Sequence, residues 1–83
     1  MNITDVRIKK LHGDTNLKAL ASITIDNQLV VHDIRVVDGK NGLFVAMPSK
    51  KVGDKYVDIS HPITTDSRNM LIEAILNEYT KLA

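Results

Sequence analysis

The chain contains no cysteine among its 83 residues. Disulfide scaffolds and thiolate metal sites are therefore excluded, and stability has to come from core packing or from association between copies of the chain. Because cysteine-free chains need no oxidising environment, we expect a cytoplasmic protein. The length leaves room for one domain, spanning residues 1–83.

Long apolar runs are also missing. No stretch approaches the roughly 20 apolar residues that a membrane-spanning helix needs. The sequence starts Met1-Asn2-Ile3-Thr4-Asp5, without a basic leader ahead of an apolar segment. We therefore expect a soluble, unexported protein without a membrane partner.

An excess of charge of one sign is absent as well. The formal net charge is +1, so any site for an anionic partner has to be local rather than a property of the whole surface. Aromatic residues are limited to Phe44, Tyr56 and Tyr79, which disfavours a base-stacking platform for single strands of nucleic acid.

Catalytic motifs are not found either. The sequence has no H-E-x-x-H, no nucleophile elbow and no glycine-rich phosphate loop. His32 and Asp33 are adjacent in a predicted strand, so their side chains should point to opposite faces. We expect structural roles for His32 and His61, and no catalytic residue, metal site, cofactor or small-molecule substrate.

What the sequence does contain is a series of alternating apolar and polar residues, which predicts strands. Asp26-Asn27 indicates a hairpin turn, and Asp38-Gly39-Lys40-Asn41-Gly42 supplies two glycines for a second turn. Pro48 should end strand pairing because it has no backbone N–H. The predicted strands are 3–11, 17–25, 29–37, 43–47 and a short fifth strand at 56–59.

After Thr65 the apolar period becomes helical, with Leu71, Ile72 and Ile75 on one face and Thr64 or Thr65 as the N-cap. Strands in series followed by one helix indicate an α+β fold. We expect an antiparallel sheet of four to five strands followed by one C-terminal helix.

The third and fourth predicted strands are apolar on both faces. Simple alternation assigns Val30, Ile34 and Val36 to one face, and only one face can lie under the helix. Because most small soluble oligomers are symmetric homodimers, we expect the other face or an edge to be buried between two copies of the chain. The residues predicted for this dimer interface are Val31, Val37, Phe44 and Ala46.

Lysines gather after Pro48, at Lys50, Lys51 and Lys55, in what reads as a loop. Loops after strands often reach ligands, although a solvated surface loop is the commoner explanation for such a cluster. Asp33 and Arg35, two residues apart, could pair with each other or across the sheet to fix its register.

The stretch "VVHDIRVVDGKNGLFVAMPSKK", with "ASITID" before it and "DISHPI" and "LNEY" after it, closely resembles the bacterial SpoVG family, stage V sporulation protein G. The resemblance covers nearly the whole chain. It implies a cytoplasmic regulator that is linked to septation, cell division and sporulation, binds DNA and in some members RNA, and forms homodimers. The residues expected to contact nucleic-acid phosphates are Lys50, Lys51, Lys55 and Arg68.

The sequence departs from the family pattern at Lys51, where relatives typically carry arginine, and at Val57, where they carry a basic residue. Lysine can still bind phosphate, but it cannot recognise a guanine with two hydrogen bonds as arginine does. An alternative is a protein-interaction module that regulates cell division through the Arg7 and Lys9 face or the polar helix face, with nucleic-acid binding incidental.

Overall fold

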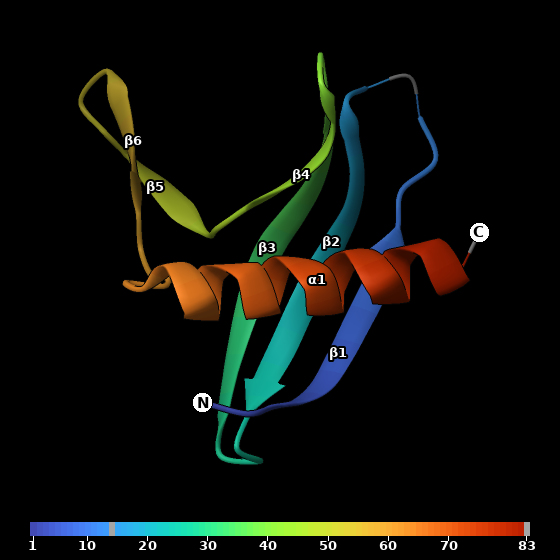
Figure 1. Cartoon of the computed structure of the whole chain (residues 1–83). Coiled ribbons are helices and arrows are strands. Elements are labelled where there is room, and N and C mark those ends of the chain that lie inside the picture. Colours follow the sequence, from blue (N-terminus) through green and yellow to red (C-terminus); the bar gives the residue numbers. More distant parts are fainter. Residues whose placement is uncertain (14, 83) are drawn as a thin grey trace.

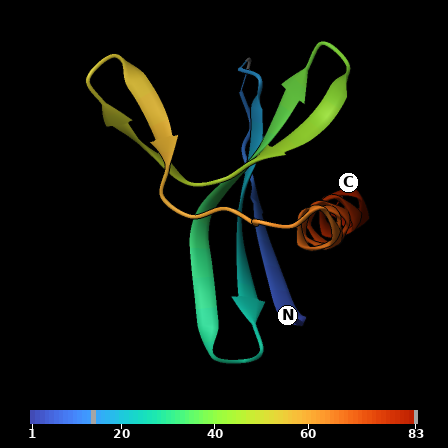
Figure 2. The ribbon, with the colours of Figure 1, turned by 60° about the vertical axis from the view of Figure 1, so that its left-hand side comes forward.

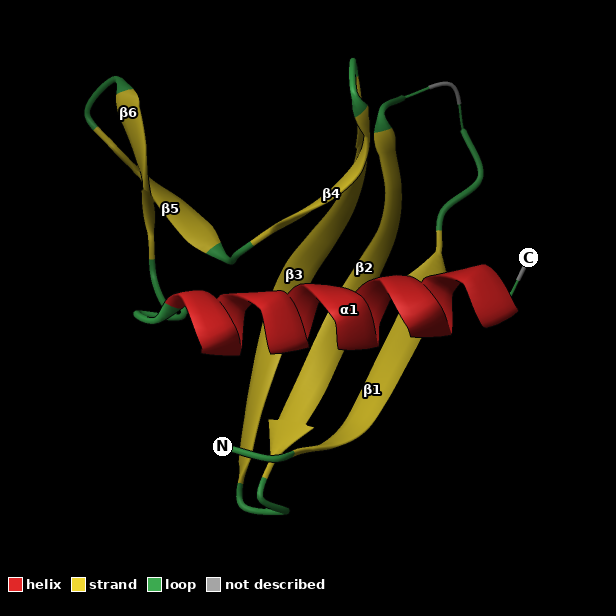
Figure 3. Ribbon diagram, viewed as in Figure 1, coloured by secondary structure: helices red, strands yellow, loops and turns green. Residues whose placement is uncertain are grey.

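The structure is a computed structural model that describes residues 1–13 and 15–82. Four antiparallel strands form a main sheet, two shorter strands form a second sheet, and one helix follows (Figure 1; Figure 3). The predicted α+β class is thereby confirmed. The elements are β1 (Ile3–Lys10), β2 (Leu17–Ile25), β3 (Leu29–Gly39), β4 (Gly42–Ala46), β5 (Ser49–Val52), β6 (Lys55–Asp58) and α1 (Thr65–Lys81).

The main sheet has the strand order β1-β2-β3-β4, so neighbours in the sequence are neighbours in the sheet. The turn between β2 and β3 has positive φ at Asp26 (53°) and Asn27 (56°), as type I′ hairpin turns require. Aspartate and asparagine tolerate this region better than other non-glycine residues. The predicted hairpin at Asp26-Asn27 is confirmed.

The helix covers one face of the main sheet and makes the hydrophobic core with it (Figure 1). Thr64 caps the helix: its hydroxyl accepts a hydrogen bond from the backbone N–H of Ser67 at 3.1 Å. The predicted N-cap is confirmed. The buried apolar side chains are Ala19, Ala21 and Ile23 of β2, Ile34 and Val36 of β3, and Leu71 and Ile75 of α1.

A β-bulge in β3 changes which side chains face the helix. Ala21 pairs with Ile34, but Ile23 pairs with Val31, so two residues of β3, His32 and Asp33, oppose one residue of β2. Asp33 has a φ of 63°. Because of the extra residue, Val31 and Ile34 both pack toward the core. The assignment of Val31 to the face away from the helix was therefore wrong.

The second sheet also differs from the sequence-based prediction. Residues 50–55 were expected to be a loop and 56–59 a fifth strand, whereas β5 and β6 pair with each other as a separate hairpin. Val52 pairs with Lys55 across Gly53-Asp54, and Gly53 has a φ of 62°. Glycine at the first position of a two-residue loop is the requirement of a type II′ turn.

The face of the main sheet that points away from α1 is called the outer face below. In Figure 2, where the helix is viewed along its axis, the main sheet lies between the helix and the β5–β6 hairpin. Side chains of the hairpin meet the outer face, where Ser49 and Tyr56 line one depression together with Leu20, Asp33 and Arg35.

Candidate nucleic-acid interface

The three predicted lysines lie on the β5–β6 hairpin, and all three are exposed. Lys51 pairs with Tyr56, whereas Lys50 pairs with Val57 and Lys55 with Val52. Since paired residues share a face and successive residues alternate, Lys51 lies on one face of the hairpin and Lys50 and Lys55 lie on the other. The lysine cluster of the sequence is divided between two faces in space.

The base of the hairpin is held to the main sheet by polar contacts. The backbone N–H of Ile59 donates to the carbonyl oxygen of Pro48 at 2.7 Å, and Pro48 is buried. The Arg35 guanidinium donates to the Ser49 hydroxyl at 3.4 Å. The proposed Arg35–Asp33 ion pair is not formed. The hairpin is therefore anchored at its base while its lysines stay exposed.

Arg68 lies in the first turn of α1, and its guanidinium donates to the carbonyl oxygen of Pro62 at 3.4 Å. Its side chain borders a shallow depression of about 490 Å³ beside the end of β6. The other lining residues are Tyr56, Val57, Asp58 and His61. Arg68 is thus close to the hairpin, although it starts from the helix.

Three of the four residues predicted for a dimer interface lie on the outer face. Val37 pairs with Phe44, and Ala46 pairs with Arg35, opposite to the strand positions that pack against the helix. Phe44 is 49% exposed and lies over Gly39, where an added Cβ would be 2.9 Å from its ring. Val31 lies on the opposite face, where it packs toward the core because of the bulge in β3.

A depression of about 300 Å³ on the outer face was not predicted from the sequence, although the Arg7 and Lys9 face was considered for a protein partner. Arg7 and Lys9 of β1 form one side, His32 and Asp33 of β3 the other, and Ser22 of β2 lies between them. Alternation along β1 could place Arg7 and Lys9 on one polar face. Alternation does not predict that His32 lies next to them, because the bulge in β3 decides which face His32 is on.

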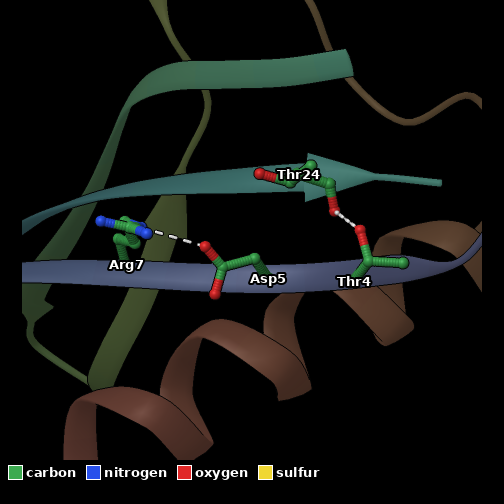
Figure 4. A network of polar contacts seen from close by, with 4 residues as sticks. All are labelled: Thr4, Asp5, Arg7 and Thr24. Atoms are coloured by element: carbon green, nitrogen blue, oxygen red, sulfur yellow. Dashed lines mark hydrogen bonds and ion pairs between the residues drawn. The ribbon is translucent and has the colours of Figure 1, made fainter. Parts of the chain in front are cut away.

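The side chain of Arg7 is held by Asp5, whose carboxylate accepts a hydrogen bond from Nε at 3.0 Å (Figure 4). This contact uses Nε, so the two terminal amino groups of the guanidinium remain for a ligand. The side chain of Arg7 is 83% exposed. Thr4 is fixed in a similar way on β1, by donating to the carbonyl oxygen of Thr24 at 3.3 Å.

Within residues 1–13 and 15–82, no three histidine or carboxylate side chains are grouped so that they could hold a metal ion. No helix in that part of the chain has both the length and the apolar character needed to cross a bilayer. His61 makes a contact with the backbone, between Nδ1 and the carbonyl oxygen of Pro62 at 3.1 Å.

Together these features define a small α+β protein with one helix-covered face and one open face. Exposed cations of β1, Arg7 and Lys9, lie on the open face, and Lys50, Lys51 and Lys55 lie on an attached hairpin. The chain belongs to the SpoVG family, whose model matches residues 1–81.

Several relatives, each described as "Putative septation protein SpoVG", match the chain over nearly its full length. The relative from Clostridium perfringens is 54% identical over 99% of this chain and 92% of its own length. The relative from Caldanaerobacter subterraneus subsp. tengcongensis is 55% identical over 98% of this chain and 90% of its own length. The relative from Bacillus subtilis is 53% identical over 99% of this chain and 86% of its own length.

Proposed function

We propose that this chain is a cytoplasmic regulator of septation and sporulation that acts by binding nucleic acid as a homodimer. The link to septation is supported by the names of its relatives. The observation that carries the nucleic-acid proposal is the projecting hairpin, which exposes Lys50, Lys51 and Lys55 beside Arg68. In the described part of the chain, none of these four side chains forms an ion pair with a carboxylate.

The cations of the hairpin favour contacts to phosphates over the reading of bases. Lysine carries a compact charge that binds phosphate from many directions, whereas the bidentate recognition of guanine requires arginine. The hairpin holds no arginine. We therefore expect binding with a marked dependence on salt and with limited discrimination between sequences.

The homodimer is supported by apolar side chains that the helix leaves uncovered. Phe44 of β4 is exposed, and Val37 lies beside it on the outer face. A two-fold axis that buries these residues would present two copies of the hairpin and double the local charge, which would compensate for a net charge of only +1. Light scattering at micromolar concentration tests this: the mass of one chain would contradict the dimer.

The nucleic-acid proposal is tested with Lys50→Glu/Lys51→Glu in an electrophoretic or anisotropy titration. The double variant should lose at least about 10-fold in affinity, and the wild-type affinity should fall steeply between low and physiological salt. The control is Lys40→Glu/Lys81→Glu, which makes the same change of charge at exposed positions away from the hairpin. Equal losses in both double variants, or a flat salt dependence, would contradict the proposal.

The same variant separates nucleic-acid binding from a protein-interaction module. Regulation in cells should be lost together with binding if nucleic acid is the target. Regulation that persists in Lys50→Glu/Lys51→Glu would favour a protein partner instead.

A further inference from the structure

We propose that a single strand of nucleic acid binds across the outer face of the main sheet. This inference rests on the proposed function and specifies its ligand and its site. The site is a line of three linked depressions, called the outer-face track here. Its basic and aromatic members include Arg7, Lys9, His32, Arg35, Tyr56 and Arg68, and its carboxylates are Asp33 and Asp58.

The first depression crosses three strands. Arg7 pairs with Ser22 in the β1–β2 register, and the small side chain of Ser22 leaves the hollow between the cations of β1 and His32 of β3. A hollow between side chains that carry several N–H donors suits the oxygens of a phosphate group. The terminal amino groups of Arg7 can reach such a ligand, because Asp5 occupies only Nε.

The second and third depressions continue this line toward the helix. The second has a volume of about 310 Å³ and shares Leu20 and Asp33 with the first. It ends at Tyr56, which also lines the third depression, beside Arg68. The first and second depressions share Leu20 and Asp33, and the second and third share Tyr56, so the three are neighbours on the surface.

Tyr56 stands in the middle of the track and is 72% exposed. It lines both the second and third depressions, where a planar base can stack on an aromatic ring. Lys51 is its cross-strand partner and shares its face of the hairpin. The hairpin therefore contributes the ring of Tyr56 to the track and places the charge of Lys51 beside that ring, while Lys50 and Lys55 lie on the opposite face.

The chain has too few aromatic residues for a stacking platform, but one exposed ring among cations favours a single strand over a duplex. In a duplex the bases are stacked inside, so Tyr56 would have no base to bind, whereas a single strand can turn a base onto the ring. Asp33 and Asp58 also line the track and would weaken the binding of any anion. An acidic peptide would gain charge contacts from the cations but would offer no base to the ring.

The test is a fluorescence anisotropy titration with a labelled oligothymidylate of about 12 nucleotides, a length within the range of known single-strand sites. Tyr56→Ala should weaken binding by about 5- to 150-fold, which corresponds to the loss of one stacked base. Tyr56→Phe should restore most of the affinity because it keeps the ring. A thermal unfolding midpoint of Tyr56→Ala equal to that of the wild type would show that the hairpin and sheet remain intact.

A matched pair of lysine variants distinguishes the two faces of the hairpin. Lys51→Gln and Arg7→Gln should each weaken binding and reduce the slope of log affinity against log salt by about 0.7. Lys50→Gln and Lys55→Gln remove the same charge from the opposite face of the hairpin and should each weaken binding less than Lys51→Gln. Lys40→Gln, at an exposed position away from the hairpin, should leave both quantities nearly unchanged. A purely structural role of these residues would not alter the salt slope.

Three outcomes would overturn the inference. Equal losses in Lys50→Gln and Lys51→Gln, with no effect of Arg7→Gln, would confine binding to the hairpin and leave the proposed function intact. Displacement of the oligonucleotide by polyglutamate at similar charge concentration would indicate a general site for acidic chains. If the wild-type protein bound neither single nor double strands, the proposed function itself would fail.

Discussion

The two faces of the main sheet are built from the same four strands, but the helix buries one face and the other is open to solvent. On the helix side, Ala19, Ile34 and Val36 have no exposed surface. On the outer face, Phe44 is half exposed, and basic side chains of β1 border a hollow. One helix can cover one face of a sheet this small, so the difference comes from the cover and not from the strands. The uncovered face is left for ligands and partners.

The largest effect is expected from truncating a side chain under the helix. Ile34→Ala leaves a cavity in the core and should lower the free energy of unfolding by about 2 to 5 kcal/mol. Val30→Ala, at an exposed position of the same strand, should cost less than about 1 kcal/mol. Urea denaturation measures both, and similar losses would show that the two faces are not energetically different.

On the outer face, the closest packing is between Gly39 and Phe44. Gly39→Ala would place a Cβ 2.9 Å from the Phe44 ring and should destabilise the protein by about 1 to 3 kcal/mol. In Phe44→Ala the ring is absent, so the added methyl group should cost less. A double-mutant cycle measures this coupling, and additive losses would contradict the contact.

Phe44→Ala also sharpens the dimer proposal. Phe44 does not lie under the helix, so a loss of 3 to 5 kcal/mol typical of a core phenylalanine is not expected. Light scattering should instead show a lower mass for the variant than for the wild type. An unchanged dimeric mass would remove Phe44 from the interface.

A smaller effect is expected at the start of the helix that covers the core. Thr64→Ala removes the acceptor for the Ser67 N–H and should cost about 1 kcal/mol. Thr64→Asn, which can accept the same hydrogen bond, should retain most of the stability. Thermal unfolding compares them, and equal stability of the alanine variant and the wild type would rule out the cap as a contributor.

The smallest effect concerns the bulge that separates the two faces of β3. Asp33 has a φ of 63°, which glycine adopts without cost and alanine does not. Asp33→Gly should therefore be more stable than Asp33→Ala by about 0.5 kcal/mol or somewhat more. Chemical denaturation resolves this difference if both variants unfold with the same m-value.

Local patterns in the sequence were sufficient to predict most of the fold. Alternation located β1 to β4, the Asp26-Asn27 pair located a turn, and Thr64 located the start of the helix. Each of these signals acts over a few residues. The second sheet was missed because Lys50 and Lys51 resemble a polar loop, although Gly53-Asp54 between Val52 and Lys55 is a hairpin signal.

The candidate site could be predicted only in part, since it depends on contacts between distant strands. The exposure of Lys50, Lys51 and Lys55 followed from their polar context. Their division between two faces followed only from the pairing of β5 with β6. Arg7 and His32 come together because β1 and β3 both flank β2, and a bulge turns the chain at that point. No pattern within a few residues of the sequence predicts that Arg7 and His32 lie close together.

The bulge at His32 and Asp33 also divides β3 into two segments, whose side chains alternate between the two faces in different registers. Val31 and the residues before it follow one alternation, and Ile34 and the residues after it follow the other. Deleting Asp33 would remove the extra residue and leave one regular alternation, in which Val31 and Ile34 still face the helix and Val30 and His32 the open face. The length of the chain between two core positions, and not only its composition, thus sets which side chains a ligand can meet.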